Sequence, residues 1–382
     1  MDQIFVHIKQ SLLDLAGTFL PDWGTVLVSI LISVITICCL GPFIMMYLTL
    51  LERKVVGRIQ NRIGPNRVGK FGLLQPVADG IKMLTKEDIV PKNADRLVHF
   101  LAPVIIMIPA LLVFAVIPFG RQMTAVDINL GLLYFLAISS TTTIAIFMAS
   151  WGSRNKFSLL GGMRSVAQLV SYEIPMVLSV VPVILMTQTL SMNAIVESQS
   201  GWSGLNWFVF RPWGLVAFVI FFLCGVAECN RCPFDLPEAE SEIIAGFHTE
   251  YSGMKFALFY MAEFMNVFTV SALAVTLFLG GWQGPWLPSW LWFFLKTLSL
   301  IMVMIWFRGT LPRLRVDQMM GLAWKFLLPL TFINIFVAGY WYFADGPARI
   351  ISSVVILVIA FWVFARLNRG YLREKRVYLF GE

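Results

Sequence analysis

Seven carboxylates gather in one stretch of the sequence, beside only two lysine or arginine residues, Arg231 and Lys255. The acids are Glu228, Asp235, Glu238, Glu240, Glu242, Glu250 and Glu263. The chain around them is 58% hydrophobic, with a mean hydropathy of +0.77. A carboxylate at the centre of a membrane helix costs about 2.5–3.5 kcal/mol on insertion scales, and such groups are commonly functional. Acids gathered beside a few cations indicate proton handling, charge sensing or ion passage.

Two acids fall inside apolar segments rather than in the loop between them. Gly161 and Gly162 predict a break before one helix, which would place Glu173 about eight residues inside it, roughly 12 Å deep at 1.5 Å per residue. Glu263 falls about ten residues into a later helix, roughly 15 Å deep. Gln168 and Tyr172 are expected to form a polar stripe with Glu173. We interpret the two deep acids as proton-relay sites, with a structural hydrogen-bonding role as the alternative.

The elements that must position these acids are membrane helices. Charged residues make up 13% of the chain, against about 25% in soluble domains. Apolar runs of about 18 or more residues recur along the whole length, each long enough to cross a bilayer. We predict an all-α polytopic membrane protein forming a single transmembrane domain over 1–382. Its nine spans are expected near 25–51, 97–118, 130–151, 165–189, 212–229, 253–280, 290–308, 323–343 and 348–367.

The basic excess has a topological pattern. If the first span runs from outside to inside, 23 of the 29 lysines and arginines fall on the cytoplasmic side and only four on the outer side. Lys255 and Lys296 lie near helix ends. This asymmetry follows the positive-inside rule, and it predicts an N-terminus outside and a C-terminus inside. The net charge of +7 therefore reflects topology rather than binding of nucleic acid.

Redox and metal ligands are scarce. The five cysteines include one Cys-x-x-Cys pair, Cys229 and Cys232, and the three histidines are His7, His99 and His248. Iron–sulfur clusters need about four thiolates at set spacing, and one such pair is a weak signal. We interpret the pair as incidental, with a redox-sensitive pair or a metal site as alternatives. We expect no cofactor and no metal bound by this chain.

The segment 52–96 is more than a connector. From Gly72 onward, Leu74, Val77, Ile81 and Leu84 share one helical face, which predicts a short amphipathic helix in the headgroup plane. It would serve either as a surface anchor or as the floor of a cavity for a lipid-like substrate. The basic run before it, which includes Arg53 and Arg58, would anchor the chain at the cytoplasmic membrane surface or dock a soluble partner. We find no internal repeat, which argues against the commonest transporter designs.

Three long strings carry a resemblance to a known family. They are ERKVVGRIQNRIGPNRVGKFGLLQPVADGIKMLTKED from Glu52, GGMRSVAQLVSYEIP from Gly161, and AECNRCPFDLPEAESEIIAGFHTEYSGMKFALFYMAEF from Ala227. They closely resemble the quinone-site membrane subunit of respiratory complex I, the family that includes the H subunit of bacterial NADH–quinone oxidoreductase and subunit one of the mitochondrial enzyme. The resemblance covers about 25–343. The helix near 348–367 and the basic tail lie outside this core.

The resemblance implies a quinone chamber and a path of buried charges that couples quinone reduction to proton translocation. In the residues that match the family, the relay would use Glu173, Glu228, Glu250 and Glu263, together with Asp235, Glu238, Glu240 and Glu242. Arg53 and Arg231 would be the cations of the quinone chamber. Glu52, Gln60 and Phe247 would lie near it. Cys229 and Cys232 stand where the family typically has Thr or Ala, and this departure leaves the acids and Arg231 in place.

The same resemblance implies partners. Quinone, either ubiquinone or menaquinone, would be the substrate, and the iron–sulfur clusters and FMN would be held by other subunits of complex I. The extra helix and basic tail favour a bacterial plasma membrane over a mitochondrial inner membrane. Two rival functions stay open at this point: the homologous subunit of a membrane-bound hydrogenase or ferredoxin-dependent complex, and a stand-alone cation transporter.

Overall fold

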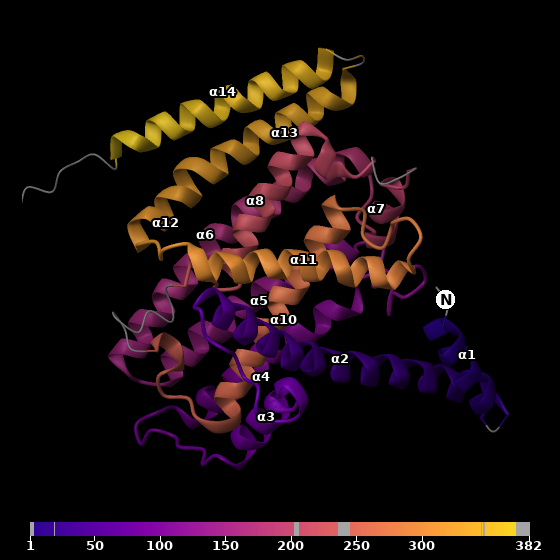
Figure 1. Cartoon of the computed structure of the whole chain (residues 1–382), viewed down its shortest axis with the longest axis vertical. Coiled ribbons are helices and arrows are strands. Elements are labelled where there is room, and N and C mark those ends of the chain that lie inside the picture. Colours follow the sequence, from indigo (N-terminus) through magenta and orange to yellow (C-terminus); the bar gives the residue numbers. More distant parts are fainter. Residues whose placement is uncertain are drawn as a thin grey trace, which may run out of the picture.

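The chain is a bundle of long helices (Figure 1). The computed structural model describes residues 4–18, 20–201, 206–235, 245–344, 346 and 348–371, and these contain no strand. Within these ranges, eight helices are long and apolar enough to cross a membrane, and α8 is apolar but shorter. The prediction of an all-α polytopic membrane protein is confirmed.

The nine apolar helices occupy the nine predicted spans (Figure 1). Several extend beyond the apolar run that predicts them. They are α2 (Asp22–Ile59), α4 (Arg96–Leu112) with the 3-10 turn η2 (Val113–Ala115), α5 (Gly131–Gly152), α6 (Lys156–Thr187), α8 (Pro212–Glu228), α10 (Gly253–Phe278), α11 (Ser289–Thr310), α12 (Val316–Leu322) continued through the π-helical segment η6 (Ala323–Leu327) into α13 (Leu328–Phe343), and α14 (Ala348–Tyr371).

Shorter helices join them. They are α1 (Ile4–Gly17), α3 (Gln75–Thr85), α7 (Met192–Ser198) and the 3-10 turns η1 (Lys70–Gly72), η4 (Phe208–Phe210) and η5 (Gly246–His248). The predicted amphipathic helix forms as α3, with Pro76 in its first turn, where proline is tolerated. Val77, Ile81 and Leu84 are exposed on it. Its apolar face is therefore free to meet lipid.

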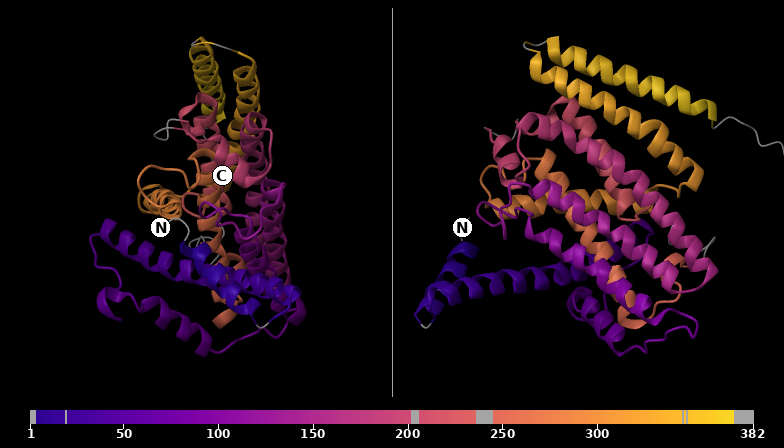
Figure 2. Two further views of the ribbon diagram at one scale, coloured as in Figure 1. Left: turned by 90° about the vertical axis from the view of Figure 1, so that its right-hand side faces the viewer. Right: turned by 180° about the vertical axis from the view of Figure 1, so that it is seen from behind.

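Helix α10 is the centre of the bundle. It packs against α2, α4, α8 and α11, and nearly all of its second half, from Phe264 to Phe278, is buried. By contrast, α1 and the first half of α2 extend away from the other helices (Figure 2). The core lies around α10, α6 and α8, the helices that also carry the predicted acids.

The structure corrects one prediction. Gly161 and Gly162 do not break the chain, because α6 begins earlier, at Lys156, and continues through both. A side chain at Gly162 would overlap Ser150 Oγ, and one at Gly161 would lie 2.6 Å from Gly246 Cα. The glycines therefore let α5 and the η5 turn approach α6 closely. Glu173 is consequently 17 residues from the start of α6, roughly 26 Å along the helix.

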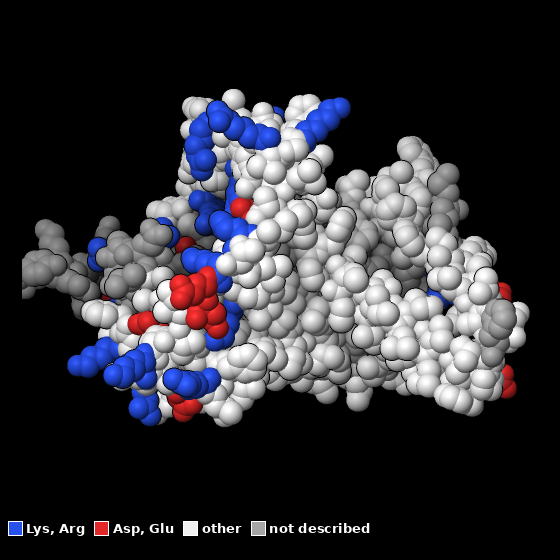
Figure 3. Space-filling model, turned by 90° about the horizontal axis from the view of Figure 1, so that it is seen from below, with Lys and Arg blue, Asp and Glu red and all other residues white. Residues whose placement is uncertain are grey.

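The charges are distributed unevenly over the molecule. On the face drawn in Figure 3, lysine and arginine gather at the end where α12 lies, and the opposite end of that face carries few. We call the end that holds α3, α12 and the start of α6 the basic end. The other end, which holds α1 and α7, is called the far end.

Candidate functional site

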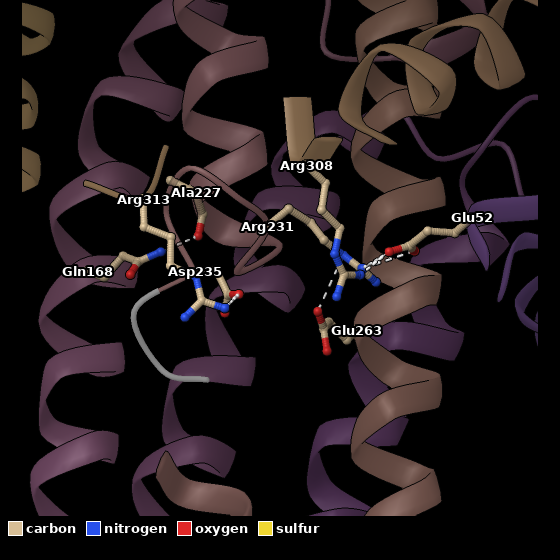
Figure 4. A network of polar contacts seen from close by, with 8 residues as sticks. All are labelled: Glu52, Gln168, Ala227, Arg231, Asp235, Glu263, Arg308 and Arg313. Carbon is tan, nitrogen blue, oxygen red and sulfur yellow. Dashed lines mark hydrogen bonds and ion pairs between the residues drawn. The ribbon is translucent and has the colours of Figure 1, made fainter. Parts of the chain in front are cut away.

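Arg231 joins two carboxylates at the basic end. Its Nη1 donates to both Glu52 oxygens at 3.1 Å, and its Nε lies 3.3 Å from Glu263 Oε1. Figure 4 shows the guanidinium between the two acids, which come from α2 and α10. All three side chains are largely buried. Glu52, Arg231 and Glu263, each predicted from the sequence as a site residue, thus form one network.

A fourth residue, Arg308 at the end of α11, completes the network by pairing with Glu52 (Figure 4). The four groups then balance as two cations and two anions. The Arg231 guanidinium also lies 4.2 Å from the centroid of the Phe264 ring, a cation–π contact. Burial alone would lower the pKa of Arg231, but Glu263 and Glu52 outweigh it and raise that pKa. Arg231 therefore carries a permanent charge.

The loop that presents Arg231 is held by buried polar side chains of α6. Gln168 Nε2 donates to the carbonyl of Ala227 at 2.8 Å (Figure 4) and to that of Phe234, also at 2.8 Å. The Tyr172 hydroxyl donates to Met319 O at 2.9 Å. Both residues donate to backbone carbonyls, and the polar stripe with Glu173 stays a prediction. Gln168 thereby fixes the loop between α8 and residue 235 against α6, and Tyr172 ties α6 to α12.

A cleft adjoins the network. Glu228 and Glu263 line it, together with Asn230, Phe247 and His248. Burial lowers the pKa of His248 to about 3, so its imidazole is neutral at physiological pH. Glu228 Oε2 is buried and has no hydrogen-bond partner among the residues that the structure describes. The cleft therefore joins a carboxyl group with unused hydrogen-bonding capacity to the charged network.

Glu173 lies on the α6 side of this region. It is half-buried, and it is near enough to Glu228 for the two carboxylates to interact electrostatically. Glu263, Glu228 and Glu173 thus lie on three adjacent helices, α10, α8 and α6. The arrangement gives a series of acids leading away from the Arg231 network.

The remaining predicted residues lie elsewhere. Asp235 Oδ2 accepts from Arg313 Nη2 at 3.1 Å (Figure 4), and Glu250 Oε1 accepts from Asn155 Nδ2 at 2.6 Å. Gln60 is exposed and accepts from Arg62 at 2.7 Å. Glu238, Glu240 and Glu242 lie outside the described residues.

Arg53 is not in the buried network. Its side chain is 47% exposed, and its Nη1 lies 2.5 Å from Asp79 Oδ2 on α3. Asp79 also accepts from Gln75 Nε2 at 3.1 Å. The pair ties the end of α2 to the amphipathic helix.

Sequence reasoning missed Arg308, Arg313 and His248 as site residues. Both arginines count among the cytoplasmic charges in the sequence, and only their pairing with buried acids separates them from surface charges. The available signal was position, because Arg308 and Glu52 each stand near the basic end of an apolar helix.

The cysteines are free thiols. Burial raises the pKa of Cys229 and of Cys232, and only the thiolate is a reactive nucleophile. Cys232 Sγ lies 3.4 Å from Leu311 O. In the part of the chain that the structure describes, no group of three or more His, Cys, Asp or Glu residues could hold a metal ion.

The fold and the site define a class: a polytopic membrane protein with a balanced network of buried charges at one end. The chain belongs to the NADH dehydrogenase family, whose model matches residues 31–339. The family resemblance predicted from the three sequence strings is thereby confirmed.

Several relatives are named as the H subunit of NADH-quinone oxidoreductase. One from Dehalococcoides mccartyi (strain CBDB1) is 56% identical over 290 residues, covering 76% of this chain and 80% of its own. Another, from strain ATCC BAA-2266 / KCTC 15142 / 195 of that species, is 51% identical and covers 85% of this chain and 92% of its own. A third, from Geobacillus kaustophilus (strain HTA426), is 46% identical, with coverage of 85% and 97%.

Proposed function

We propose that this chain is the H subunit, a membrane component, of a proton-translocating NADH–quinone oxidoreductase, complex I. The similarity to relatives of that name over most of their length supports this. In this proposal, other subunits carry FMN and the iron–sulfur clusters and deliver electrons. The present chain contributes to the quinone chamber and transmits the effect of quinone reduction to buried acids.

The observation that carries the proposal is the position of Arg231 between Glu52 and Glu263, beside the cleft that Glu228 lines. Reduction of a quinone near this network would add negative charge or remove protons. At an effective dielectric of 20, one unit charge about 10 Å away changes the energy of a carboxylate by roughly 1.7 kcal/mol. This is enough to change its protonation ratio more than tenfold.

Such a change would pass along the acids as protonation. In the proposed sequence, Arg231 shifts its pairing toward the reduced quinone, Glu263 takes up a proton as its cation withdraws, and Glu228 and Glu173 respond in turn. Like-charge neighbours that repel one another titrate as coupled groups. The three helices that carry these acids therefore supply a route for charge away from the chamber.

The test replaces the relay acids without changing their size. In the assembled complex, Glu228→Gln and Glu173→Gln should lower quinone reduction and proton uptake together, while NADH oxidation by ferricyanide persists because it bypasses the quinone site. Glu197→Gln, at an exposed acid of α7, is the matched control and should keep both activities. Full quinone reduction with full proton pumping in both relay variants would contradict the relay proposal.

The rival functions differ in their partners. Identification of the subunits that co-purify with the tagged chain separates complex I from a hydrogenase or ferredoxin-dependent complex, and purification of the chain alone would favour a stand-alone transporter.

We further propose that the basic end faces the cytoplasm of a bacterium and the N-terminus lies outside. The gathering of lysine and arginine at that end supports this orientation (Figure 3). Reporter fusions after Arg121 and after Lys375 should give outside and inside signals respectively. Equal signals from both fusions would contradict the nine-helix topology.

A further inference from the structure

Lys296 is a lysine buried at the far end of the bundle, away from the charge network. It lies in the second turn of α11, and only 6% of the residue is exposed. Nothing in the proposed relay uses it. A buried lysine is costly unless its surroundings satisfy the charge, so its environment calls for a physical account.

The contacts of Lys296 identify its charged form. Its Nζ lies 2.7 Å from Leu279 O, 3.0 Å from Gly281 O and 2.7 Å from Gln283 O. A neutral amine has two N–H donors, whereas an ammonium has three. Three carbonyl acceptors at these distances therefore fit the ammonium form, which we take as the state of Lys296.

Aromatic rings complete the cage. The Nζ lies 4.0 Å from the ring centroid of Trp207 and 5.8 Å from that of Trp292, and aromatic faces attract cations. In the described part of the chain, no carboxylate lies within ion-pair distance of this ammonium. At the basic end, by contrast, each arginine of the network is paired with a carboxylate. Lys296 thus leaves an uncompensated positive charge inside the far end.

The same region is rich in buried backbone polar groups. Gln199 Nε2 donates to Thr276 O at 3.0 Å, and its Oε1 accepts from Gly280 N at 3.0 Å. Gln283 Nε2 donates to Val196 O at 2.6 Å. Buried polar groups that lack a protein partner recruit ordered water. The Lys296 ammonium fills the centre of three such acceptors itself, so water is not needed there.

The cage lies just past the C-terminal end of α10, whereas the acid cleft lies beside the middle of that helix. Sixteen residues separate Glu263 from Leu279, roughly 24 Å along the helix. The side chains between them are largely apolar and buried, including Met265, Phe268, Leu273 and Phe278. The cleft is therefore closed toward the far end first by apolar packing and then by a fixed cation.

We propose that Lys296 is an electrostatic seal that keeps water and protons from crossing the far end of the bundle. A buried positive charge repels hydronium, as the fixed charges of selective pores do. The acids of the cleft then exchange protons only with the basic end. This inference deepens the proposed relay function, because one-sided access is what a relay needs, but the seal can be tested without turnover.

The experiment measures passive proton entry into vesicles that contain the assembled complex, without NADH or quinone. A pH-sensitive dye inside reports the response to an acid jump outside. Lys296→Met removes the charge and orphans three carbonyls, so it should raise proton conductance several-fold over wild type. Lys296→Arg keeps the charge and should leak less than Lys296→Met.

Thr297→Val is the matched control. Thr297 is the next residue, is fully buried, and donates only to Phe293 O of its own helix at 2.8 Å. Its loss removes a hydroxyl at the same depth without removing charge, so conductance should stay at the wild-type level.

Two results would overturn the proposal. One is an assembled Lys296→Met complex of lower thermal stability but unchanged conductance, which would make Lys296 a structural clamp only. The other is a proton conductance of vesicles with the wild-type complex that exceeds the conductance of protein-free vesicles. This result would show that the far end is not sealed, and it can be obtained even if the Lys296→Met complex fails to assemble. Because neither readout involves quinone reduction, failure of the seal and failure of the relay are distinguishable.

Discussion

Arg308 pairs with Glu52 although 256 positions separate them in the sequence. Glu52 thereby contacts two guanidinium groups, Arg308 and Arg231, while Arg231 contacts two carboxylates. Because Glu52 has two partners, Arg231 can move away from it while Arg308 still pairs with the Glu52 carboxylate. Under the proposed function, Arg308 is therefore a positioning residue, because it would keep Arg231 available to the quinone.

The first prediction concerns Arg308→Ala. Removing one partner of a buried ion pair costs about 3–5 kcal/mol, but the Arg308 side chain is 42% exposed, so the loss of stability should be well below that. Quinone reductase activity of the assembled complex should fall, because Arg231 is then held by Glu52. Arg308→Lys should restore part of the rate. The exposed Arg315→Ala at the same end is the control, and an equal loss there would show a general effect of basic charge.

The second prediction concerns Arg231 itself. Arg231→Ala leaves Glu52 and Glu263 without their shared cation, so the quinone reductase rate should fall more than in Arg308→Ala. The ferricyanide reaction should persist. Arg231→Lys should be intermediate, because a lysine can reach only one acid at a time. If both reactions disappear together, the residue is needed for assembly rather than for the quinone site.

The third prediction separates two roles for Arg53. The sequence resemblance predicts a chamber cation, whereas the exposed ion pair with Asp79 indicates an anchor for α3. Exposed pairs contribute about 0.2–1 kcal/mol, so neither Arg53→Ala nor Asp79→Asn should prevent assembly. Both should raise the KM for quinone if α3 borders its passage. The charge-swapped double variant, Arg53→Asp with Asp79→Arg, should then restore the KM for quinone toward the wild-type value. If the double variant keeps a raised KM for quinone, direct contact of Arg53 with quinone is favoured instead.

Sequence patterns specify the membrane helices well and the site only in part. Nine apolar runs require nine helices, because backbone polar groups in lipid must bond within their own segment. The acids in apolar helices, Glu173, Glu228 and Glu263, stand out for the same energetic reason. Pairing between distant residues has no such local signal. The end of an apolar run sets Arg308 apart from Arg315, but only the packing of α11 on α2 makes Arg308 a partner of Glu52.

The glycines of α6 show the limit most clearly. Gly-Gly in a sequence favours a break in a helix, yet here both glycines lie inside one. The determining fact is the approach of Ser150 and Gly246, which belong to segments on either side in the sequence. A local rule predicts the wrong outcome because the glycines serve close packing between elements rather than a turn.

The fourth prediction follows from that packing. Gly162→Ala forces a methyl group into the space that Ser150 Oγ occupies. Overpacking of this kind typically costs about 1–3 kcal/mol, so the thermal stability of the complex should fall. Ser150→Gly in the same chain removes the obstructing side chain and should restore stability. An equally unstable double variant would mean that the α5–α6 contact is not the cause.

The last prediction concerns pH and His248. Its pKa is lowered by burial to about 3 in the folded chain, against an ordinary value of 6.5. Between these values the unfolded chain binds one more proton than the folded chain, so stability rises with pH. The contribution of neutral His248 to the free energy of unfolding is complete above pH 6.5 and is lost as the pH falls toward 3, at up to about 1.4 kcal/mol per pH unit.

His248→Gln cannot titrate and should remove this slope from the thermal stability of the complex between pH 6.5 and 4.5. His7→Gln is the control, because His7 is exposed, and its curve should follow the wild type. A His248→Gln curve as steep as the wild type would show that His248 already binds a proton in the folded protein, and that the cleft beside Glu228 and Glu263 holds a second cation.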